Sequence, residues 1–216
     1  MNCIVTAGPT FEPLDYVRRL TNFSTGRLGS DLACFLAGRG HTVTLLRGEA
    51  ATYRNEIAAH EVQSFTTSAD LAKRLEVLSR HSVDAVFHAA AVSDYRFGRI
   101  WLRAGGGEMV EIKSGKISTR DGVLLAELTP TPKVIAQLRE WYPSARLVGW
   151  KYEVEGGRAD VIALAERQMV ECETNASVAN GKAYGAGFGL VTGPGKSIHV
   201  PDAAGLFAAL ENFIGK

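Results

Sequence analysis

The stretch DYVRRLTNFSTGRLG, residues 15–29, combines glycines, arginines, hydroxyls and an asparagine directly before an amphipathic segment. It follows the apolar run NCIVTAG, which ends at Gly8 and predicts a buried strand. Ser24 and Thr25 are typical N-cap residues, and the unpaired N–H groups of a helix start favour an anion. Glycine allows a phosphate to approach the backbone closely. The residues expected around such an anion are Ser24, Thr25, Gly26 and Gly29, with positive charge nearby from Arg18, Arg19 and Arg27.

The long connection between Gly8 and Gly26 distinguishes this stretch from a dinucleotide-binding fingerprint. That fingerprint runs from strand through G-x-G-x-x-G to helix with almost no gap, whereas here a polar loop intervenes that contains Asp15, Arg18 and Asn22. The pattern predicts a phosphate-binding turn with additional polar chemistry beside it. The alternative is an ordinary irregular loop that leads into a capped helix.

Composition excludes several classes of protein. The 216 residues have a formal net charge of +1, which gives no electrostatic reason to expect nucleic acid or an anionic membrane as a partner. The three cysteines lack C-x-x-C spacing, which argues against a disulfide framework or a zinc site. We see neither a signal peptide nor an apolar run long enough to span a bilayer, so we expect a cytoplasmic protein.

Strand-like and helix-like segments alternate through the first half of the chain. This order predicts an α/β fold, with a Rossmann-like, mostly parallel sheet and helices on both faces. Helical periodicity disappears over about 95–130, where short β-like runs predict a flap outside the main sheet. A terminal antiparallel strand pair is expected at 190–192 and 198–200, and Asp202 is expected to cap a last helix. We expect one domain, 1–216. The expected strands are 2–8, 42–47, 62–65, 83–89, 146–150 and 176–179, and the expected helices are 25–37, 68–79, 133–141, 159–170 and 203–213.

Four clusters follow predicted strands and should share one rim of the sheet. They are Gly8 with residues 22–29, residues 88–95, residues 149–153 and residues 178–180. Small residues at 89–91 would let a ligand lie against backbone, and Asp94 offers a carboxylate, although it could equally cap a turn. Trp150 would flank a flat base or lie in the core. Asn180 would contact a base edge or close an Asx-turn.

The flap contains Lys113 and Lys116 around a serine and a glycine. A lysine on such an element can reach over phosphates as a point charge, or it can be an ordinary surface lysine. His88 follows a buried strand and is more typical of a core residue than of a base. The sequence contains no H-x-x-x-H, G-x-S-x-G or P-loop pattern, which disfavours zincins, α/β-hydrolases and P-loop enzymes.

Together these pieces resemble the phosphopantothenate–cysteine ligase family, which catalyses the phosphopantothenoylcysteine synthetase step of coenzyme A synthesis. The matching segments, in family order, are VTAGPT, EPLDYVRRLTNFSTGRLG, HAAAVSDY, GKIS, VGWKYE and SVAN. No flavin-dependent decarboxylase region accompanies them, so we expect a stand-alone ligase. The resemblance implies joining of 4′-phosphopantothenate to L-cysteine with Mg²⁺ and a nucleoside triphosphate, ATP or CTP, through an acyl-nucleotide. It also implies a homodimer.

The same resemblance implies roles for individual residues. Asn22 would contact the substrate carboxylate and the acyl intermediate, and Lys116 would act in the second half-reaction. The nucleotide-binding residues would be Gly8, Ser24, Gly26, Gly29, Trp150 and Asn180. The substrate-binding residues would be Arg18, Asn22, Ala90, Ala91 and Asp94. The metal ligands are left open.

The sequence departs from the family pattern at three places. Gly8-Pro9 stands where the family usually has Gly-Gly, the flap motif is shortened, and Trp150 replaces a phenylalanine. The choice between Lys113 and Lys116 therefore stays open, and the choice between ATP and CTP leans slightly toward ATP. Two alternatives to the ligase are an NADP-dependent short-chain reductase, with Arg47 for a 2′-phosphate, and a non-catalytic nucleotide-binding relative. No tyrosine has a lysine four residues on, which argues against the reductase.

Overall fold

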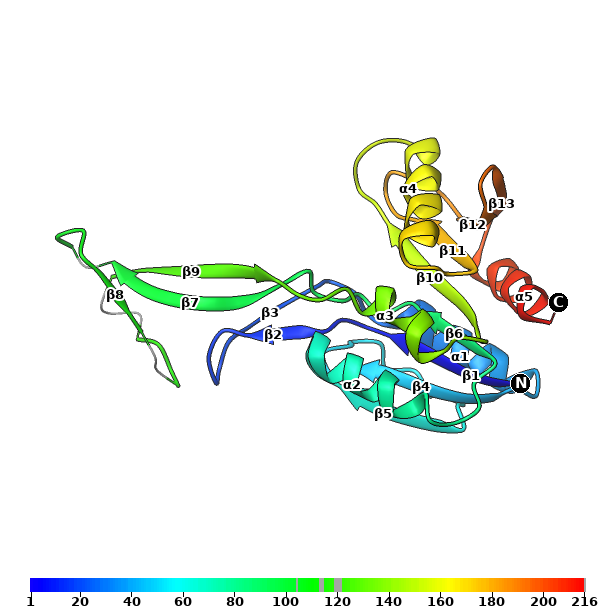
Figure 1. Cartoon of the computed structure of the whole chain (residues 1–216), viewed down its shortest axis with the longest axis horizontal. Helices are drawn as coiled ribbons and strands as arrows, with labels where there is room; N and C mark the ends of the chain where they lie inside the picture. The colour runs from blue at the N-terminus through cyan, green and yellow to red at the C-terminus, as the bar shows by residue number, and fades with distance from the viewer. Residues whose placement is uncertain (104, 113–114, 119–121, 216) are drawn as a thin grey trace.

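The computed structural model describes residues 1–103, 105–112, 115–118 and 122–215. Its centre is one eight-stranded sheet (Figure 1). Six strands are parallel, and two more are added at one edge by successive antiparallel pairings. In spatial order the strands are β13 (Lys196–Val200), β12 (Phe188–Gly193), β11 (Ala176–Asn180), β10 (Arg146–Tyr152), β6 (Ala85–His88), β1 (Asn2–Ala7), β4 (Thr42–Gly48) and β5 (Glu61–Phe65).

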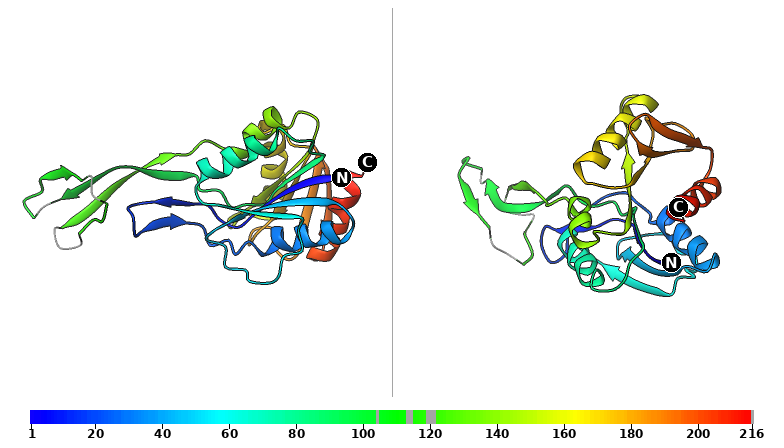
Figure 2. Two further views of the ribbon diagram at one scale, coloured as in Figure 1. Left: turned by 90° about the horizontal axis from the view of Figure 1, so that it is seen from below. Right: turned by 45° about the vertical axis from the view of Figure 1, so that its right-hand side comes forward.

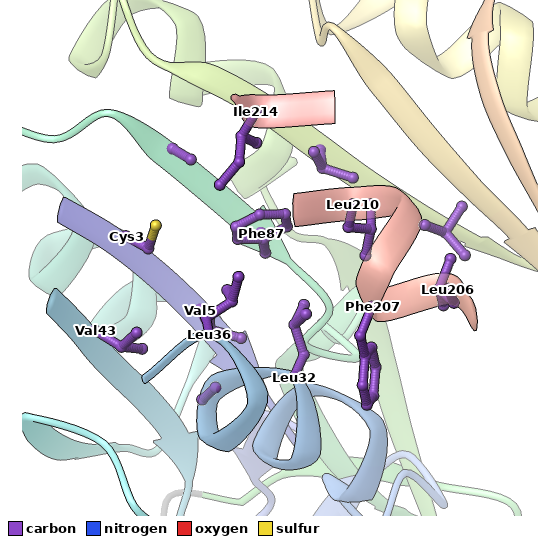
Figure 3. Packing of buried hydrophobic residues seen from close by; sticks show 14 of the residues in the cluster. Cys3, Val5, Leu32, Leu36, Val43, Phe87, Leu206, Phe207, Leu210 and Ile214 are labelled. Carbon is purple, nitrogen blue, oxygen red and sulfur yellow. The ribbon is translucent and has the colours of Figure 1, made fainter. Parts of the chain in front are cut away.

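Helices cover both faces of this sheet, so the predicted Rossmann-like α/β fold is confirmed (Figure 2). On one face lie α1 (Arg27–Gly38) and α5 (Ala203–Ile214). On the other lie α2 (Ser68–Leu78), α3 (Val134–Trp141) and α4 (Arg158–Glu171). The largest core cluster fills the first face, where Leu32 and Leu36 of α1 and Leu210 of α5 meet Val5 and Phe87 (Figure 3). These side chains are fully buried because parallel strands are covered on both sides.

The chain order along the sheet reverses between β1 and β6. The strands on one side run outward as β1, β4, β5, and on the other side as β6, β10, β11. In open α/β sheets this switch point is where ligands bind, at the carboxyl ends of the strands. Pairing continues past the strand ends here, because Pro9 and Ala91 form a parallel bridge. The two outgoing segments therefore leave the sheet side by side.

A flap protrudes far beyond the sheet, as predicted (Figure 1). Its three antiparallel strands are β7 (Tyr95–Arg103), β8 (Met109–Glu111) and β9 (Val123–Pro130). Beside it lies a hairpin of β2 (Phe11–Pro13) and β3 (Arg19–Thr21), within the polar connection between Gly8 and Gly26. The sequence does not predict this hairpin, because three-residue strands are too short to show a period-two pattern.

The helix starts differ in how they are capped. The predicted cap of α5 is confirmed, since the side chain of Asp202 accepts a hydrogen bond from the N–H of Gly205. For α1 the N-cap is Gly26, with φ 80° and no side-chain cap, rather than Ser24 or Thr25. The left-handed turn at Gly26 places the hydroxyl of Thr25 one position too early, where it accepts from the N–H of Arg27. Among the described residues, no helix is long and apolar enough to cross a membrane.

Candidate functional site

Two backbone segments, residues 8–10 and the segment of Ala91, meet beside Asn22 at the carboxyl ends of β1 and β6. The N–H of Ala91 donates to the carbonyl oxygen of Gly8 over 3.0 Å, and the carbonyl oxygen of Ala91 accepts from the N–H of Thr10 over 3.1 Å. The side chain of Asn22 donates from Nδ2 to that same carbonyl oxygen, also over 3.1 Å. Asn22 is exposed. The fold thus joins two of the predicted clusters, with an accessible amide at the junction.

The glycine turn is closely packed. A Cβ at Gly8 would lie 2.8 Å from the Cβ of Ala51, and one at Gly26 would lie 3.1 Å from the same methyl group. A Cβ at Gly29 would lie 2.7 Å from the Cβ of Ala7, so this glycine lets α1 pack against β1. The fold brings Gly8 and Gly26 together, but Ala51 fills the space beside them. Their contact with a phosphate stays a prediction.

The segment that contains Ala51 is held over the start of α1. The N–H of Tyr53 donates to the carbonyl oxygen of Thr25 over 3.0 Å, and its hydroxyl donates to Asp31 over 2.5 Å. Arg47 donates to the carbonyl oxygen of Tyr53. The guanidinium that the reductase alternative would need for a 2′-phosphate is therefore engaged in holding this segment. Ser24, also predicted as a site residue, is half-buried between Asn22 and the helix.

Trp150 and Asn180 lie at the carboxyl ends of β10 and β11, on the face covered by α1 and α5. Trp150 packs against the core cluster of that face, as does Val178, and strand alternation places Asn180 on the same side as Val178. Nε1 of Trp150 and Oδ1 of Asn180 are buried, with no hydrogen-bond partner among the described residues. Buried polar atoms are normally paired. One donor and one acceptor are thus left for a polar ligand on this face.

A cavity of about 300 Å³ lies on the opposite face, between the end of β6 and helices α3 and α4. A Cβ at Gly149 would contact Ile135 of α3 and Gln168 of α4, so Gly149 faces these helices. Because neighbouring residues of a strand point to opposite faces, the Trp150 side chain lies on the other face. The predicted residue Asp94 lines the cavity, but Trp150 and Asn180 do not. The predicted clusters therefore share one rim but are divided between its two faces.

The cavity contains cationic side chains that the sequence analysis missed, namely Lys133, Lys151 and Arg167. Lys151 pairs with a glutamate two residues on at 2.8 Å, and Arg167 pairs with Glu171 at 2.6 Å. Hydrogen bonding to Glu171 raises the pKa of the Arg167 guanidinium, so it stays charged. One signal was available: in GWKYE the two-residue period places Lys151 on the same face as Gly149. Arg167 gives no such signal, because it lies on a helix with many charged residues.

The tip of the hairpin holds the flap segment Gly115–Ser118. The carboxylate of Asp15 accepts from the N–H of Ile117 over 3.2 Å and from Nη2 of Arg18 over 2.5 Å. Nη2 of Arg18 also donates to the carbonyl oxygen of Ile117 over 2.7 Å. Hydrogen bonding, first of all from Arg18, holds the pKa of Asp15 well below its usual range. Arg18, predicted to bind substrate, is thus used in this structure to fix the flap segment.

Lys116 lies within this held segment, whereas Lys113 lies outside the described residues. Arg18 is four residues from Asn22 along the direction of β3, which corresponds to roughly 13 Å at the rise of a strand. The chain therefore places Arg18 and the segment of Lys116 at the hairpin tip, away from Asn22. Among the described residues, no group of three or more histidine, cysteine, aspartate or glutamate side chains could hold a metal ion.

Comparison with known protein families gives a match over most of the chain. The family model described as "DNA/pantothenate metabolism flavoprotein C-terminal domain" matches residues 1–199. The Coenzyme A biosynthesis bifunctional protein CoaBC of Thermococcus kodakarensis is 34% identical over 187 residues, which are 85% of this chain and 42% of that protein. The Bacillus subtilis protein of the same name is 31% identical over 191 residues, 88% of this chain and 42% of that protein. The chain thus spans about two fifths of the length of these relatives.

Solved structures have the same fold. The DNA/pantothenate metabolism flavoprotein from Streptococcus pneumoniae superposes with a TM-score of 0.85 at 24% identity, covering 100% of this chain and 98% of that one. A Cab2 H337A mutant, solved in complex with phosphopantothenate-cysteine, superposes with a TM-score of 0.71 at 17% identity, covering 99% and 87%. At these identities the superpositions establish the fold alone.

Proposed function

Because the chain belongs to the DNA/pantothenate metabolism flavoprotein C-terminal domain family, we propose that it is a ligase that joins 4′-phosphopantothenate to L-cysteine with a nucleoside triphosphate. The observation that supports this most directly is the hydrogen bond from Asn22 to Ala91. It joins the TNFSTGRLG and HAAAVSDY segments, on which the resemblance rests, at the switch point between β1 and β6. The presence of CoaBC proteins among the relatives supports the same proposal.

The proposed reaction has two balanced steps. A carboxylate oxygen of 4′-phosphopantothenate attacks the α-phosphorus, and the bond to pyrophosphate breaks, giving an acyl-nucleotide. The amine nitrogen of cysteine then attacks the acyl carbon, the bond to the nucleoside monophosphate breaks, and the amine proton is released. The first step brings negative groups together, so the protein must offset their charge. No side-chain nucleophile is needed.

The residues at the junction and in the cavity suit this chemistry. Asn22 would orient the carboxylate by a neutral hydrogen bond that adds no negative charge. The phosphates would lie in the cavity with Lys133, Lys151 and Arg167, which offers more room than the glycine turn filled by Ala51. Their positive charges would stabilise the leaving pyrophosphate.

A magnesium ion fits this arrangement although the described residues contain no cluster of three or more acidic, histidine or cysteine side chains. Mg²⁺ is usually held by one or two carboxylates together with substrate phosphates. Asp94, which is exposed and lines the cavity, is the carboxylate that would hold it. When bound, the ion would neutralise phosphate charge and favour attack at the α-phosphorus.

The flap supports a proposed homodimer. Its strands expose large apolar side chains, whose burial against a second copy would be favourable. These side chains are Tyr95, Met109, Val110, Val123 and Leu128. The hairpin tip holds Lys116 away from Asn22 of the same chain, so a second copy would be the one whose site Lys116 reaches. Lys116 would then offset charge on the acyl-nucleotide as cysteine attacks.

The two alternatives differ in what supports them. The backbone bridge between Pro9 and Ala91 closes the crevice in which a dinucleotide would lie, and Arg47 is engaged with the backbone of Tyr53. Both observations argue against the reductase. A non-catalytic relative would bind nucleotide without turnover, and the crowded glycine turn is the feature that would favour it.

The decisive experiment is an incubation of the purified chain with 4′-phosphopantothenate, cysteine, Mg²⁺ and ATP or CTP in turn, followed by mass spectrometry. An amide product with nucleoside monophosphate supports the proposal and identifies the preferred nucleotide. Release of a diphosphate would point to an acyl-phosphate route and contradict the mechanism. Nucleotide binding without product would favour the non-catalytic relative.

A further inference from the structure

His88 lies at the end of β6 and lines the cavity between α3 and α4, with 6% of its surface exposed. Its Nδ1 is 3.1 Å from the hydroxyl oxygen of Thr6 on the neighbouring strand β1. That hydroxyl oxygen also accepts the N–H of Ala90 over 3.1 Å. A short relay therefore runs from the backbone of Ala90 through Thr6 to one edge of the imidazole.

The relay determines which ring nitrogen has the hydrogen. A hydroxyl group has a single hydrogen to donate, and Thr6 is completely buried, so this hydrogen needs a protein acceptor. Nδ1 of His88 is the acceptor at hydrogen-bond distance. If Nδ1 had the hydrogen instead, the hydroxyl hydrogen of Thr6 would be left without an acceptor in the interior. The neutral ring is therefore protonated at Nε2. Burial lowers the pKa of His88 to about 4, so the ring is neutral at pH 7.

The Nε2 edge is left for the cavity. Among the described residues, Thr6 is the hydrogen-bond partner of the ring, and it occupies the Nδ1 edge. In most buried histidines with a structural role, both ring nitrogens are paired within the protein. The cavity is also lined by the cations Lys133, Lys151 and Arg167, which can contact phosphate oxygens; Lys151 and Arg167 are each paired with a glutamate.

We propose that His88 is a nucleotide-binding residue, whose Nε2–H donates a hydrogen bond to a phosphate oxygen of a nucleoside triphosphate in this cavity. The inference rests on the proposed function and adds to it a specific contact. A neutral imidazole gives a directed hydrogen bond without a further charge, and the relay through Thr6 fixes the ring before the ligand arrives. Such a preorganised donor needs no rearrangement on binding.

The first test observes the ring directly by ¹⁵N NMR of histidine-labelled protein. Between pH 6 and 8 the His88 ring should be the Nε2–H tautomer and should not titrate, despite Asp94, Glu171 and the three cations around the cavity. Adding ATP should shift the Nε2 resonance more than the Nδ1 resonance. An Nδ1–H tautomer, or titration near the ordinary value of about 6.5, overturns the proposal.

The second test measures the Kd of ATP and of inorganic tripolyphosphate. We expect His88→Leu to raise both by about tenfold, the equivalent of about 1.4 kcal/mol, and His88→Gln to recover most of the affinity because it restores a donor. His81→Gln is the matched control, since His81 is exposed and precedes β6 at the opposite edge of the sheet.

The results separate this inference from the proposed function. If the wild-type chain forms the amide product but folded His88→Leu protein binds both probes as tightly as wild type, the inference fails alone. If the wild-type chain binds neither probe, both the inference and the proposed function fail. Thermal melting of each variant identifies loss of fold, and the NMR measurement tests the wild-type ring independently of any substitution.

Discussion

The side chain of Asn22 donates a hydrogen bond to the backbone carbonyl oxygen of Ala91 over 3.1 Å, which joins the segment before α1 to the segment after β6. These segments are almost seventy residues apart in the sequence. The same carbonyl oxygen accepts from the N–H of Thr10. The acceptor that holds the Asn22 side chain is therefore a backbone atom fixed by the pairing at the switch point. An exposed amide is thereby held at a defined place on the rim.

Replacing Asn22 by alanine should abolish formation of the acyl-nucleotide while leaving the fold intact. We expect the rate of the first step to fall by about 10²-fold or more, because a misplaced carboxylate loses the alignment that the attack requires. Single-turnover mass spectrometry measures the intermediate, and thermal melting checks the fold. Asn55→Ala is the control, since Asn55 is also exposed and bonds only to Tyr53 among the described residues. Wild-type turnover in Asn22→Ala would remove this residue from the proposed mechanism.

Replacing Lys133 by methionine should weaken nucleotide binding. Methionine keeps much of the apolar stem but removes the charge from the cavity. We expect the KM for the nucleoside triphosphate to rise by about tenfold, with a smaller change in kcat and a weaker dependence of KM on salt than in the wild type. Steady-state kinetics at two ionic strengths provide the measurement. Lys73→Met, on the exposed side of α2, is the control. Equal KM values would place the phosphates elsewhere, and the glycine turn would then be favoured.

The elements with strong periodicity were predictable from the sequence. Strands such as β1 and β6 are largely apolar runs because both faces of the sheet are covered, and α2 shows Leu71 and Leu75 on one buried face. The flap was predicted from the loss of helical periodicity after residue 95. The carboxyl ends of parallel strands share one edge of a sheet, which made the rim of the candidate site predictable as well.

The division of that rim between two faces was not recognised. It follows from strand alternation, which turns Trp150 toward α1 and α5 and Lys151 toward α4. The role of Ala51 was not predictable either, because it depends on how residues 49–53 fold back over the glycines. Likewise, the pairing of Asp15 with Ile117 joins residues about a hundred positions apart, and no local pattern marks it.

Two glycine-to-alanine substitutions within α1 should distinguish the effect of packing on stability from the effect of helix propensity. At Gly29 the new Cβ would lie 2.7 Å from the Cβ of Ala7 and 3.0 Å from the carbonyl oxygen of Thr6, so α1 would have to move away from β1. We expect Gly29→Ala to lower the free energy of unfolding by about 1–3 kcal/mol. Gly38→Ala, whose new Cβ would have no atom of the described residues within 4 Å, should raise it by about 0.5–1 kcal/mol. Urea denaturation measures both changes in the free energy of unfolding. Equal changes would mean that helix propensity alone determines the effect of each substitution.

Replacing Asp15 by asparagine should release the flap segment Gly115–Ser118 from the hairpin tip. Asparagine cannot form the ion pair with Arg18, and its single carbonyl oxygen cannot accept every hydrogen bond that the carboxylate accepts. Hydrogen exchange at the N–H of Ile117 should therefore become faster, while exchange at the buried strand β1 stays unchanged as an internal reference. Unaltered exchange at Ile117 would show that other contacts hold the segment.

The same contact should depend on pH in a defined direction. The pKa of Asp15 is lower in the folded chain than in the unfolded chain. Ionised Asp15 therefore stabilises its contact with the flap segment at pH values above the unfolded pKa of about 4. This stabilisation should decline as the pH falls from about 4 toward the depressed folded value, and it should be constant from pH 5 to 8. Exchange at Ile117, corrected for the intrinsic pH dependence of exchange, should accordingly accelerate only in acid. In Asp15→Asn the corrected rate should be fast at every pH. An increase in the corrected wild-type exchange rate at Ile117 near neutral pH would show that a different titrating group holds the flap segment.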